Sequence, residues 1–232
     1  MSISAVPTFE LERRIAADGC DVIVGFDEVG RGSLAGPAMV GAAAFRAADL
    51  DRAQQTVPQY LADSKMLTEH RREALYEPLQ TWVDAYAIGS ATNQEIDEWG
   101  ISHALGVAAL RALDEVERAL GIDGHGDARV GAILDGPNDY ITKALGTFEA
   151  PLVPVPAHVI TQVKGDQRCC SVAAAAVLAK VTRDRLMVAF AENPDYARYG
   201  WAHNKGYGSK AHRVAIAEYG PSDLHRVSWN LT

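Results

Sequence analysis

Four carboxylates of this 232-residue chain stand where apolar stretches end, and together they have the chemistry of a divalent-cation site. They are Asp27 and Glu28 after residues 21–26, Asp135 after 130–134, and Asp166 after 159–163. Side chains at strand ends sit on rigid supports and can be aimed at one another across a sheet. Clustered carboxylates repel one another unless hard cations such as Mg²⁺ or Mn²⁺ neutralise them. Two such ions could activate a water and stabilise a leaving oxygen at phosphorus.

The alternative interpretation is that each acid is an ordinary turn residue. Asp followed by Gly is common turn chemistry, and Asp135-Gly136 fits that description. Four acids that all follow apolar stretches favour a common site, but spacing alone leaves both interpretations open.

Alternating strands and helices must position these acids. Apolar runs bounded by glycine, proline or aspartate predict strands at 21–26, 37–45, 85–89, 130–134 and 159–163. Helical spacing of apolar residues predicts helices at 69–82, 101–120, 171–191 and 211–219. Residues 136–158 contain four prolines and little periodicity, and residues 137–158 are interpreted as either a partner surface or only a loop. The order predicts an α/β or α+β single domain whose C-terminal third is helical.

Composition limits the class of protein. The chain is 48% hydrophobic, which is enough for a core, and it has no apolar run near the length of a membrane span. Three cysteines and an acidic start without a secretory signal predict a reduced, cytoplasmic protein. The net charge of −8 alone argues against nucleic acid. However, residues 161–232 hold 10 Lys and Arg against 6 Asp and Glu, which indicates either a local phosphate-binding face or a chance gradient.

Six ordered motifs carry a resemblance to a known family. They are the opening Asp27-Glu28-Val29-Gly30-Arg31-Gly32, then Asp63-Ser64-Lys65, Leu134-Asp135-Gly136, Lys164-Gly165-Asp166 with the helix to Asp184, Lys205-Gly206-Tyr207-Gly208, and Gly220-Pro221-Ser222 with His225-Arg226-Val227-Ser228. In order and content they closely resemble ribonuclease HII, the type 2 ribonuclease H family. The resemblance covers residues 21–228, nearly the whole chain.

The resemblance implies an RNase H-like α/β fold, a mixed central sheet flanked by helices. One catalytic domain is expected over residues 1–232, with a core at about 20–190 and a C-terminal extension at about 191–232 that carries substrate contacts. The implied activity is hydrolysis of the RNA strand of RNA/DNA hybrids and incision on the 5′ side of ribonucleotides embedded in duplex DNA. Two divalent ions, Mn²⁺ or Mg²⁺, are implied, and the products carry a 3′-hydroxyl and a 5′-phosphate.

By the same resemblance, Asp27, Glu28, Asp135 and Asp166 are the catalytic, metal-binding acids. Gly30, Arg31, Gly32 and Tyr207 are similar to the group that recognises the ribose 2′-hydroxyl at the RNA–DNA junction. Glycines permit close backbone approach to a 2′-hydroxyl, and a tyrosine offers a ring for stacking and a hydroxyl for hydrogen bonding. A half-buried loop tyrosine and an ordinary surface arginine are the alternatives.

Further substrate contacts are expected from Ser64, Lys65, Lys164, Lys180 and Arg183. Lys180, Arg183 and Asp184 stand at helical spacings i, i+3 and i+4, so an intrahelical salt bridge is the rival interpretation.

Two departures from the family pattern and two alternative functions remain. Asp135 and Asp166 are 31 residues apart, a separation longer than is usual, and Met66 replaces a common lysine.

The alternative functions are a ribonuclease HIII-type enzyme and a catalytically silent module that binds RNA/DNA hybrids. The expected partner is nucleic acid, in ribonucleotide excision repair, with no membrane. The chain is expected to act as a monomer, and replication or repair proteins are open as partners.

Overall fold

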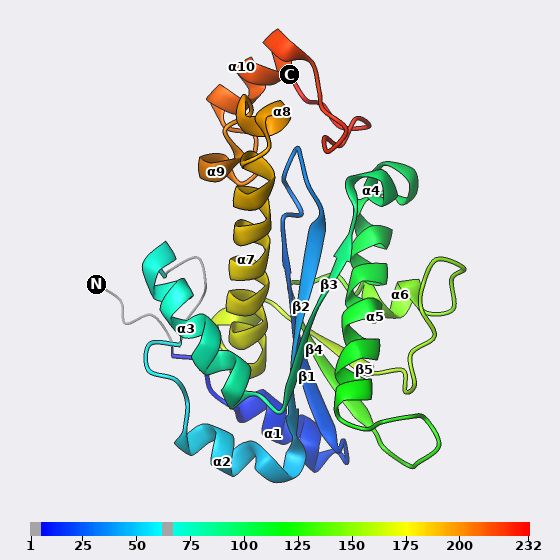
Figure 1. Ribbon diagram of the computed structural model, residues 1–232. Helices are drawn as coiled ribbons and strands as arrows, with labels where there is room; N and C mark the ends of the chain where they lie inside the picture. Colours follow the sequence, from blue (N-terminus) through cyan, green and yellow to red (C-terminus); the bar gives the residue numbers. More distant parts are fainter. Residues whose placement is uncertain (1–5, 62–66) are drawn as a thin grey trace.

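The computed structural model describes residues 6–61 and 67–232, and within them one mixed sheet of five strands forms the centre (Figure 1). The strands are β1 (Val22–Val29), β2 (Ala38–Arg46), β3 (Ala85–Ala91), β4 (Val130–Asp135) and β5 (His158–Gln162). Their order across the sheet is β3-β2-β1-β4-β5. β1 pairs antiparallel with β2 and parallel with β4, which in turn runs parallel to β5. The ends of β1, β4 and β5 therefore meet at one edge of the sheet.

Helices and connecting loops make up the rest of the described chain. The helices are α1 (Glu10–Ala17), α2 (Leu50–Gln55), α3 (Glu69–Trp82), α4 (Asn93–Trp99), α5 (Ile101–Ala119), α6 (Ile141–Ala144), α7 (Cys170–Ala191), α8 (Pro194–Ala197), α9 (Trp201–Asn204) and α10 (Lys210–Tyr219), with short 3₁₀ turns η1 (Ala47–Asp49) and η2 (Gly165–Gln167). Thr68 caps α3 by accepting a hydrogen bond from the Arg71 N–H. None of these helices is long and apolar enough to cross a membrane.

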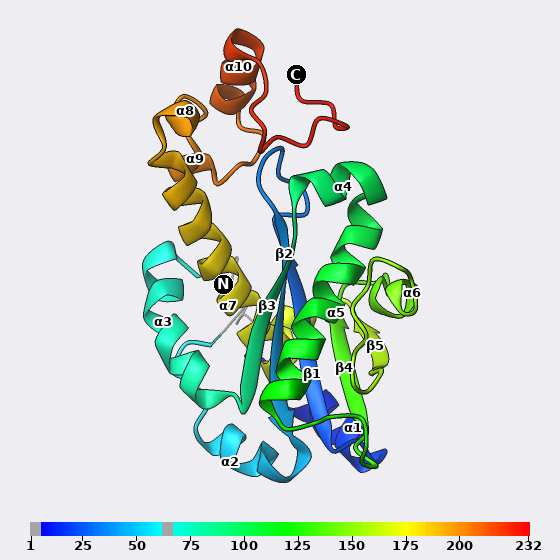
Figure 2. The same ribbon diagram turned by 45° about the vertical axis from the view of Figure 1, so that its right-hand side comes forward.

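Helices cover both faces of the sheet (Figure 2). One core lies between the sheet and α5, and a second lies between the sheet and α7, with α1 and α3 beside it. A methyl group placed on Gly25 or Gly41 would overlap the backbone of α7. The small residues of strand and helix therefore let α7 lie directly against β1 and β2, as its alanine content predicts.

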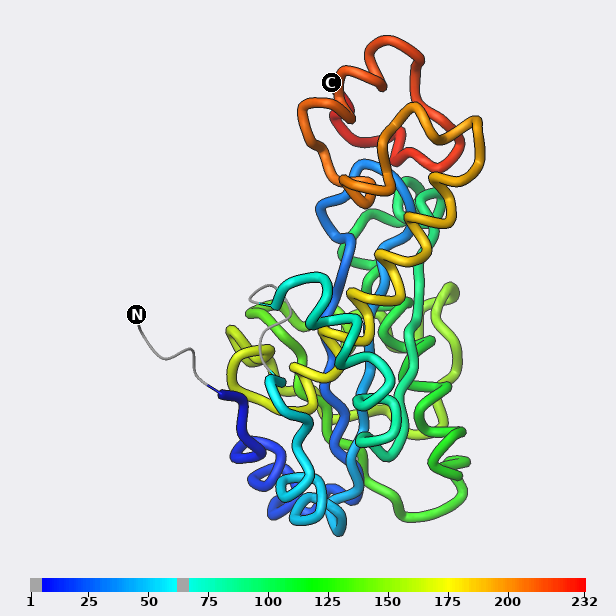
Figure 3. Tube along the Cα trace, turned by 60° about the vertical axis from the view of Figure 1, so that its left-hand side comes forward, coloured from blue at the N-terminus to red at the C-terminus, as the bar shows by residue number. Residues whose placement is uncertain are grey.

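The segment after α7, residues 192–232, lies above the turn between β1 and β2 (Figures 1 and 3). Tyr207 forms an isolated antiparallel bridge with Ser33, and His225 forms one with Ala35. Residues 174 and 190 positions apart therefore lie side by side at this end of the molecule.

All five predicted strands and all four predicted helices are present, with ends within three residues of the predicted ones. Two expectations need correction. Asp27 and Glu28 do not follow the first strand but lie inside it, because pairing with β2 continues as far as Val29. The stretch 136–158 is not wholly a loop, since it contains α6 and the buried Tyr140.

Candidate active site

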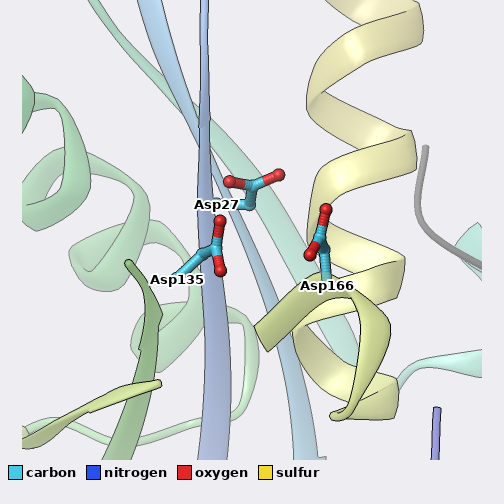
Figure 4. A group of neighbouring side chains, drawn as sticks. All are labelled: Asp27, Asp135 and Asp166. Carbon is cyan, nitrogen blue, oxygen red and sulfur yellow. The ribbon is translucent and has the colours of Figure 1, made fainter. Parts of the chain in front are cut away.

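Three aspartates from different parts of the chain converge at the edge where the parallel strands end. Asp27 comes from β1, Asp135 is the last residue of β4, and Asp166 lies in η2 directly after β5. One carboxylate oxygen of each lies within 4.8 Å of the other two. Figure 4 shows the three side chains pointing toward one another.

Strand register explains this convergence. Phe26 pairs with Leu134 in the parallel β1–β4 ladder, so the next residues, Asp27 and Asp135, emerge at the same level. The backbone N–H of Gly165 donates to Oδ1 of Asp135 at 2.7 Å and ties η2 to the end of β4. Asp166 is thereby held beside the other two. Asp27 and Asp166 are buried and Asp135 is half-buried.

Glu28 lies outside this aspartate triad. Neighbouring residues of a strand point to opposite faces of a sheet, so Glu28 faces away from Asp27. Its Oε1 accepts from Arg31 at 3.2 Å, and its Oε2 accepts from the Tyr140 hydroxyl at 3.1 Å. Burial, together with the nearby Glu28 and Asp27 carboxylates, raises the pKa of Tyr140 well above its usual value, so its hydroxyl keeps its proton.

The predicted substrate-recognition residues also come together. Residues 30–37, called here the glycine loop, connect β1 to β2 and pass under Tyr207. The Gly30 N–H donates to the Tyr207 hydroxyl at 3.2 Å, and Leu34 N–H donates to the Gly206 carbonyl at 2.8 Å. Arg31 and Gly32 are exposed at the tip of the loop, and Tyr207 is 37% exposed.

Arg183 has a role other than the phosphate contact that the sequence predicts. Its side chain is fully buried, and its guanidinium donates to the carbonyls of Pro37, Lys205 and Ala35 at 2.8, 2.9 and 3.2 Å. Burial lowers the pKa of this guanidinium. The expectation of a backbone phosphate contact is therefore wrong for Arg183, which fastens the glycine loop to the Lys205 turn from inside.

The other predicted cations differ in how accessible they are. Lys164 is exposed and adopts a left-handed backbone conformation, with φ of +59°, immediately before Gly165. Lys180 forms the intrahelical ion pair with Asp184, at 2.7 Å, that the sequence leaves open. The Lys180 ammonium also lies 5.7 Å from the centre of the Tyr207 ring. Ser64 and Lys65 lie outside the described residues.

A buried pair of histidines supports the backbone at Tyr207. The Ser222 N–H can only donate, so His225 Nδ1 accepts it at 2.9 Å, and the proton of His225 sits on Nε2. That Nε2 donates to His212 Nε2 at 3.1 Å, and His212 Nδ1 donates to the Tyr207 carbonyl at 2.9 Å. Burial lowers the pKa of His212, and burial with the neighbouring ring lowers that of His225 to about 4. Both rings are therefore neutral near pH 7.

Sequence reasoning gave no role to several residues of this site. Arg226, His212 and His225 are fully buried beneath the glycine loop, and the His225-Arg226 motif was the signal that marked two of them. Tyr140 carried no signal, because the proline-bearing stretch in which it stands has little periodicity.

The triad fits a hard divalent cation. It offers three anionic oxygen donors, close enough together to hold an ion jointly, and Mg²⁺ and Mn²⁺ prefer such donors. Asp27, Asp135 and Asp166 would hold the metal, and it would supply the positive charge that activates water and stabilises a leaving oxygen.

Comparison with known proteins agrees with this geometry. The family model described as Ribonuclease HII matches residues 24–232. The chain is 44% identical to ribonuclease HII of Streptomyces avermitilis, covering 96% of this chain and 83% of that protein. It is 36% identical to ribonuclease HII of Bacillus subtilis over 94% of this chain and 73% of that one.

Solved structures show the same fold. Ribonuclease H2 of Pyrococcus horikoshii superimposes with a TM-score of 0.66 at 25% identity, covering 90% of this chain and 94% of that one. An RNase HIII solved in complex with Mn²⁺ gives a TM-score of 0.64 at 18% identity, with 92% and 68% of the two chains covered. At that identity the likeness concerns the fold alone.

The five-stranded mixed sheet and the acids at its edge define a metal-dependent nuclease of the RNase H-like fold. Within that class, the chain belongs to the ribonuclease HII family. It is accordingly a hydrolase with ribonuclease H activity that acts on nucleic acid and depends on divalent metal. The predicted fold class, family and enzyme class are confirmed.

Proposed function

We propose that this enzyme cuts the strand that contains ribonucleotides, on the 5′ side of the ribonucleotide, both in RNA/DNA hybrids and in DNA duplexes with a single embedded ribonucleotide. Hydrolysis leaves a 3′-hydroxyl and a 5′-phosphate, and the proposed role is the removal of ribonucleotides from DNA in the cytoplasm of the cell. The observation that carries the proposal is that a metal-binding residue and a ribose-reading residue are close together along the chain. Asp27, in the triad, and Gly30, which binds Tyr207, are three residues apart at the end of β1.

Asp27, Asp135 and Asp166 are the proposed catalytic and metal-binding residues, holding two ions, Mn²⁺ or Mg²⁺, during the reaction. Glu28 is the proposed fourth acid. To join the other three, its carboxylate must leave Arg31, Tyr140 or both, since each of its oxygens accepts from one of them.

Gly30, Arg31, Gly32 and Tyr207 are the proposed readers of the ribose at the junction. The Tyr207 hydroxyl accepts from the Gly30 N–H, so its own proton is left to donate to a sugar or phosphate oxygen of the substrate. A Cβ on Gly32 would meet no protein atom within 4 Å, and the φ of Gly32 is not positive. Folding therefore does not require glycine at position 32, whereas close approach of a nucleic acid does.

The remaining substrate contacts are proposed for Lys164 and Lys180, and for Ser64 and Lys65, which lie outside the described residues. Lys164 is exposed after β5, beside Asp166, where a phosphate would approach the triad. Residues 1–232 are proposed to act as one catalytic domain and as a monomer, with the extension after residue 190 placing Tyr207 over the glycine loop.

The test uses three DNA duplexes of one sequence: all DNA, one embedded ribonucleotide, and the same duplex with a 2′-O-methyl group at that position. A continuous RNA/DNA hybrid is the fourth substrate. Products are mapped with and without Mn²⁺ or Mg²⁺. We expect metal-dependent cleavage of the hybrid and one metal-dependent incision 5′ of the embedded ribonucleotide, with none in the other two DNA duplexes. Binding without cleavage would instead favour the silent hybrid-binding module. Cleavage of continuous hybrids alone would overturn the proposed junction specificity.

A further inference from the structure

Beneath the glycine loop lies a buried arginine to which the catalytic proposal assigns nothing. We propose that Arg226 is a positioning residue for ribonucleotide specificity: by drawing the carbonyls of Gly30 and Arg31 inward, it presents the N–H groups of Arg31 and Gly32 to the substrate. This inference rests on the proposed function. It names the residue that makes the glycine loop present N–H donors, and not carbonyl acceptors, to the substrate.

The contacts of Arg226 are dense. Its side chain is fully buried, and Nη2 donates to the Gly30 carbonyl at 2.6 Å while Nη1 donates to the Arg31 carbonyl at 2.8 Å. Nη2 and Nε also donate to the Gly36 carbonyl, at 3.1 and 3.3 Å. One guanidinium thus holds both ends of the glycine loop. Within the described residues, no carboxylate oxygen lies within ion-pair distance of it.

Peptide geometry and these contacts together determine which way the N–H groups of the loop point. The C=O of one residue and the N–H of the next share a plane and, in a trans peptide, point in opposite directions. The structure has no cis peptide among its described residues. Carbonyls of Gly30 and Arg31 that point at Arg226 therefore send the N–H groups of Arg31 and Gly32 away from it. In the described part of the chain neither N–H has an acceptor, and both residues are exposed.

Only arginine suits this position. Its rigid planar fork carries five N–H donors and can hold three carbonyls at fixed angles, whereas the lysine ammonium is a single point on a flexible stem. Arg183 works beside it, since a Cβ on Gly30 would overlap the Arg183 guanidinium. Burial and the nearby Arg183 lower the pKa of Arg226 to about 9, so both side chains are still charged near pH 7. Two buried cations under the loop also favour a phosphate above it.

The test is Arg226→Lys, with Arg46→Lys as the matched control. Arg46 also donates to a carbonyl, that of Leu120, but it stands at the opposite end of β2. Dissociation constants are measured for the all-DNA duplex and the duplex with one ribonucleotide, with Ca²⁺ in place of the catalytic metal. We expect Arg226→Lys to lose about tenfold or more of the preference for the ribonucleotide, on the scale of one charged hydrogen bond, with all-DNA binding unchanged. The control should keep the preference.

Two results would overturn the inference: an Arg226→Lys protein that keeps the preference, or one that weakens binding to both duplexes equally. An absent preference in the unmodified enzyme would instead overturn the proposed function. A second measurement avoids any folding defect, because it uses the unmodified protein. The amide signals of Arg31 and Gly32, followed by NMR, should shift when the ribonucleotide duplex is added and shift less with all-DNA duplex. Equal or absent shifts would contradict the inference.

Discussion

Asp27 of the aspartate triad and Gly30 of the glycine loop are three residues apart at the end of β1, yet the two regions are built in opposite ways. The triad consists of acids at strand ends, positioned by sheet register and by one bond from Gly165 to Asp135. The glycine loop is held from beneath by two buried arginines, and the backbone at Tyr207 by two neutral histidines. One region is a set of like charges whose mutual repulsion a bound cation would relieve. The other is a set of backbone groups whose direction depends on buried donors.

This difference predicts how the two regions respond to substitution. Removing one acid relieves repulsion and leaves the fold intact, because the strands hold the backbone. Changing a support of the glycine loop leaves buried carbonyls without donors, which costs folding free energy as well as recognition. A substitution in the triad should therefore lower activity without lowering stability. A substitution of a support of the glycine loop should lower both recognition and stability.

The largest effect is expected for Asp27→Asn. Losing one anionic oxygen donor should lower the cleavage rate by at least about 100-fold, on the order of the 3 kcal/mol lost with one electrostatic catalytic group. The metal-free melting temperature should stay the same or rise. Single-turnover kinetics at saturating Mn²⁺ and a thermal melt check both points, and near-normal turnover would refute the assignment of Asp27 to the metal.

Tyr207 should come next in size. Tyr207→Ala removes ring and hydroxyl together. It should lower kcat/KM by an amount equivalent to roughly 1–3 kcal/mol, the range for one base–aromatic contact. Tyr207→Phe keeps the ring but loses the bond from the Gly30 N–H, so it separates stacking from the hydroxyl. The measurement is kcat/KM on the single-ribonucleotide duplex and on a continuous hybrid. The loss should be greater on the first, and small, equal effects on both would make Tyr207 a packing residue.

A smaller effect is expected for Gly32→Ala, with Gly30→Ala as its counterpart. At Gly32 a methyl group meets only open space, so the melting temperature should hold while kcat/KM on the single-ribonucleotide duplex falls about tenfold. At Gly30, where φ is +78° and the Arg183 guanidinium is in the way, the same change should also lower the melting temperature. Equal thermal effects at the two positions would contradict the division of roles.

The smallest effect concerns Glu117 on α5, far from both regions. Its carboxylate is buried, Oε2 accepts from the Val155 N–H at 3.0 Å, and burial raises its pKa to about 7. Between about pH 4.5 and 7, Glu117 is therefore protonated in the folded state but ionised in the unfolded chain, where its pKa has the ordinary value of 4.5. The free energy of unfolding therefore falls as the pH rises from about 4.5 through 7. Glu117→Gln should raise the melting temperature at pH 8 by about 2–4 °C, and less at pH 5. An equal change at both pH values would exclude this titration.

Much of the fold could be predicted from the sequence because its signals are local. Apolar periodicity and flanking glycines marked the five strands and four long helices, and Thr68 marked the start of α3. The short helices α1, α2, α4, α6, α8 and α9 were missed, since four to eight residues carry too little periodicity. Local residue patterns also could not show that β1 runs on through Asp27 and Glu28, because that extension depends on pairing with β2.

The candidate site was only partly readable for a similar reason. Asp27, Asp135 and Asp166 were visible as acids near strand ends, and their convergence follows from parallel register. The displacement of Glu28 toward Tyr140 depends on strand faces and on a residue far along the chain. The burial of Arg183 was hidden as well, because an arginine that donates to three carbonyls looks, in sequence, like one that binds phosphate.

The separation of chemistry from recognition is tested most directly by Asp135→Asn. Its preference for the single-ribonucleotide duplex over all-DNA duplex is measured with Ca²⁺ as a ratio of dissociation constants, alongside its cleavage of the same duplex with Mn²⁺. If the glycine loop reads the ribonucleotide, we expect that cleavage is lost while the binding ratio matches that of the unmodified enzyme. A protein that loses its preference together with its cleavage would show that the aspartates, and not the glycine loop, read the ribonucleotide.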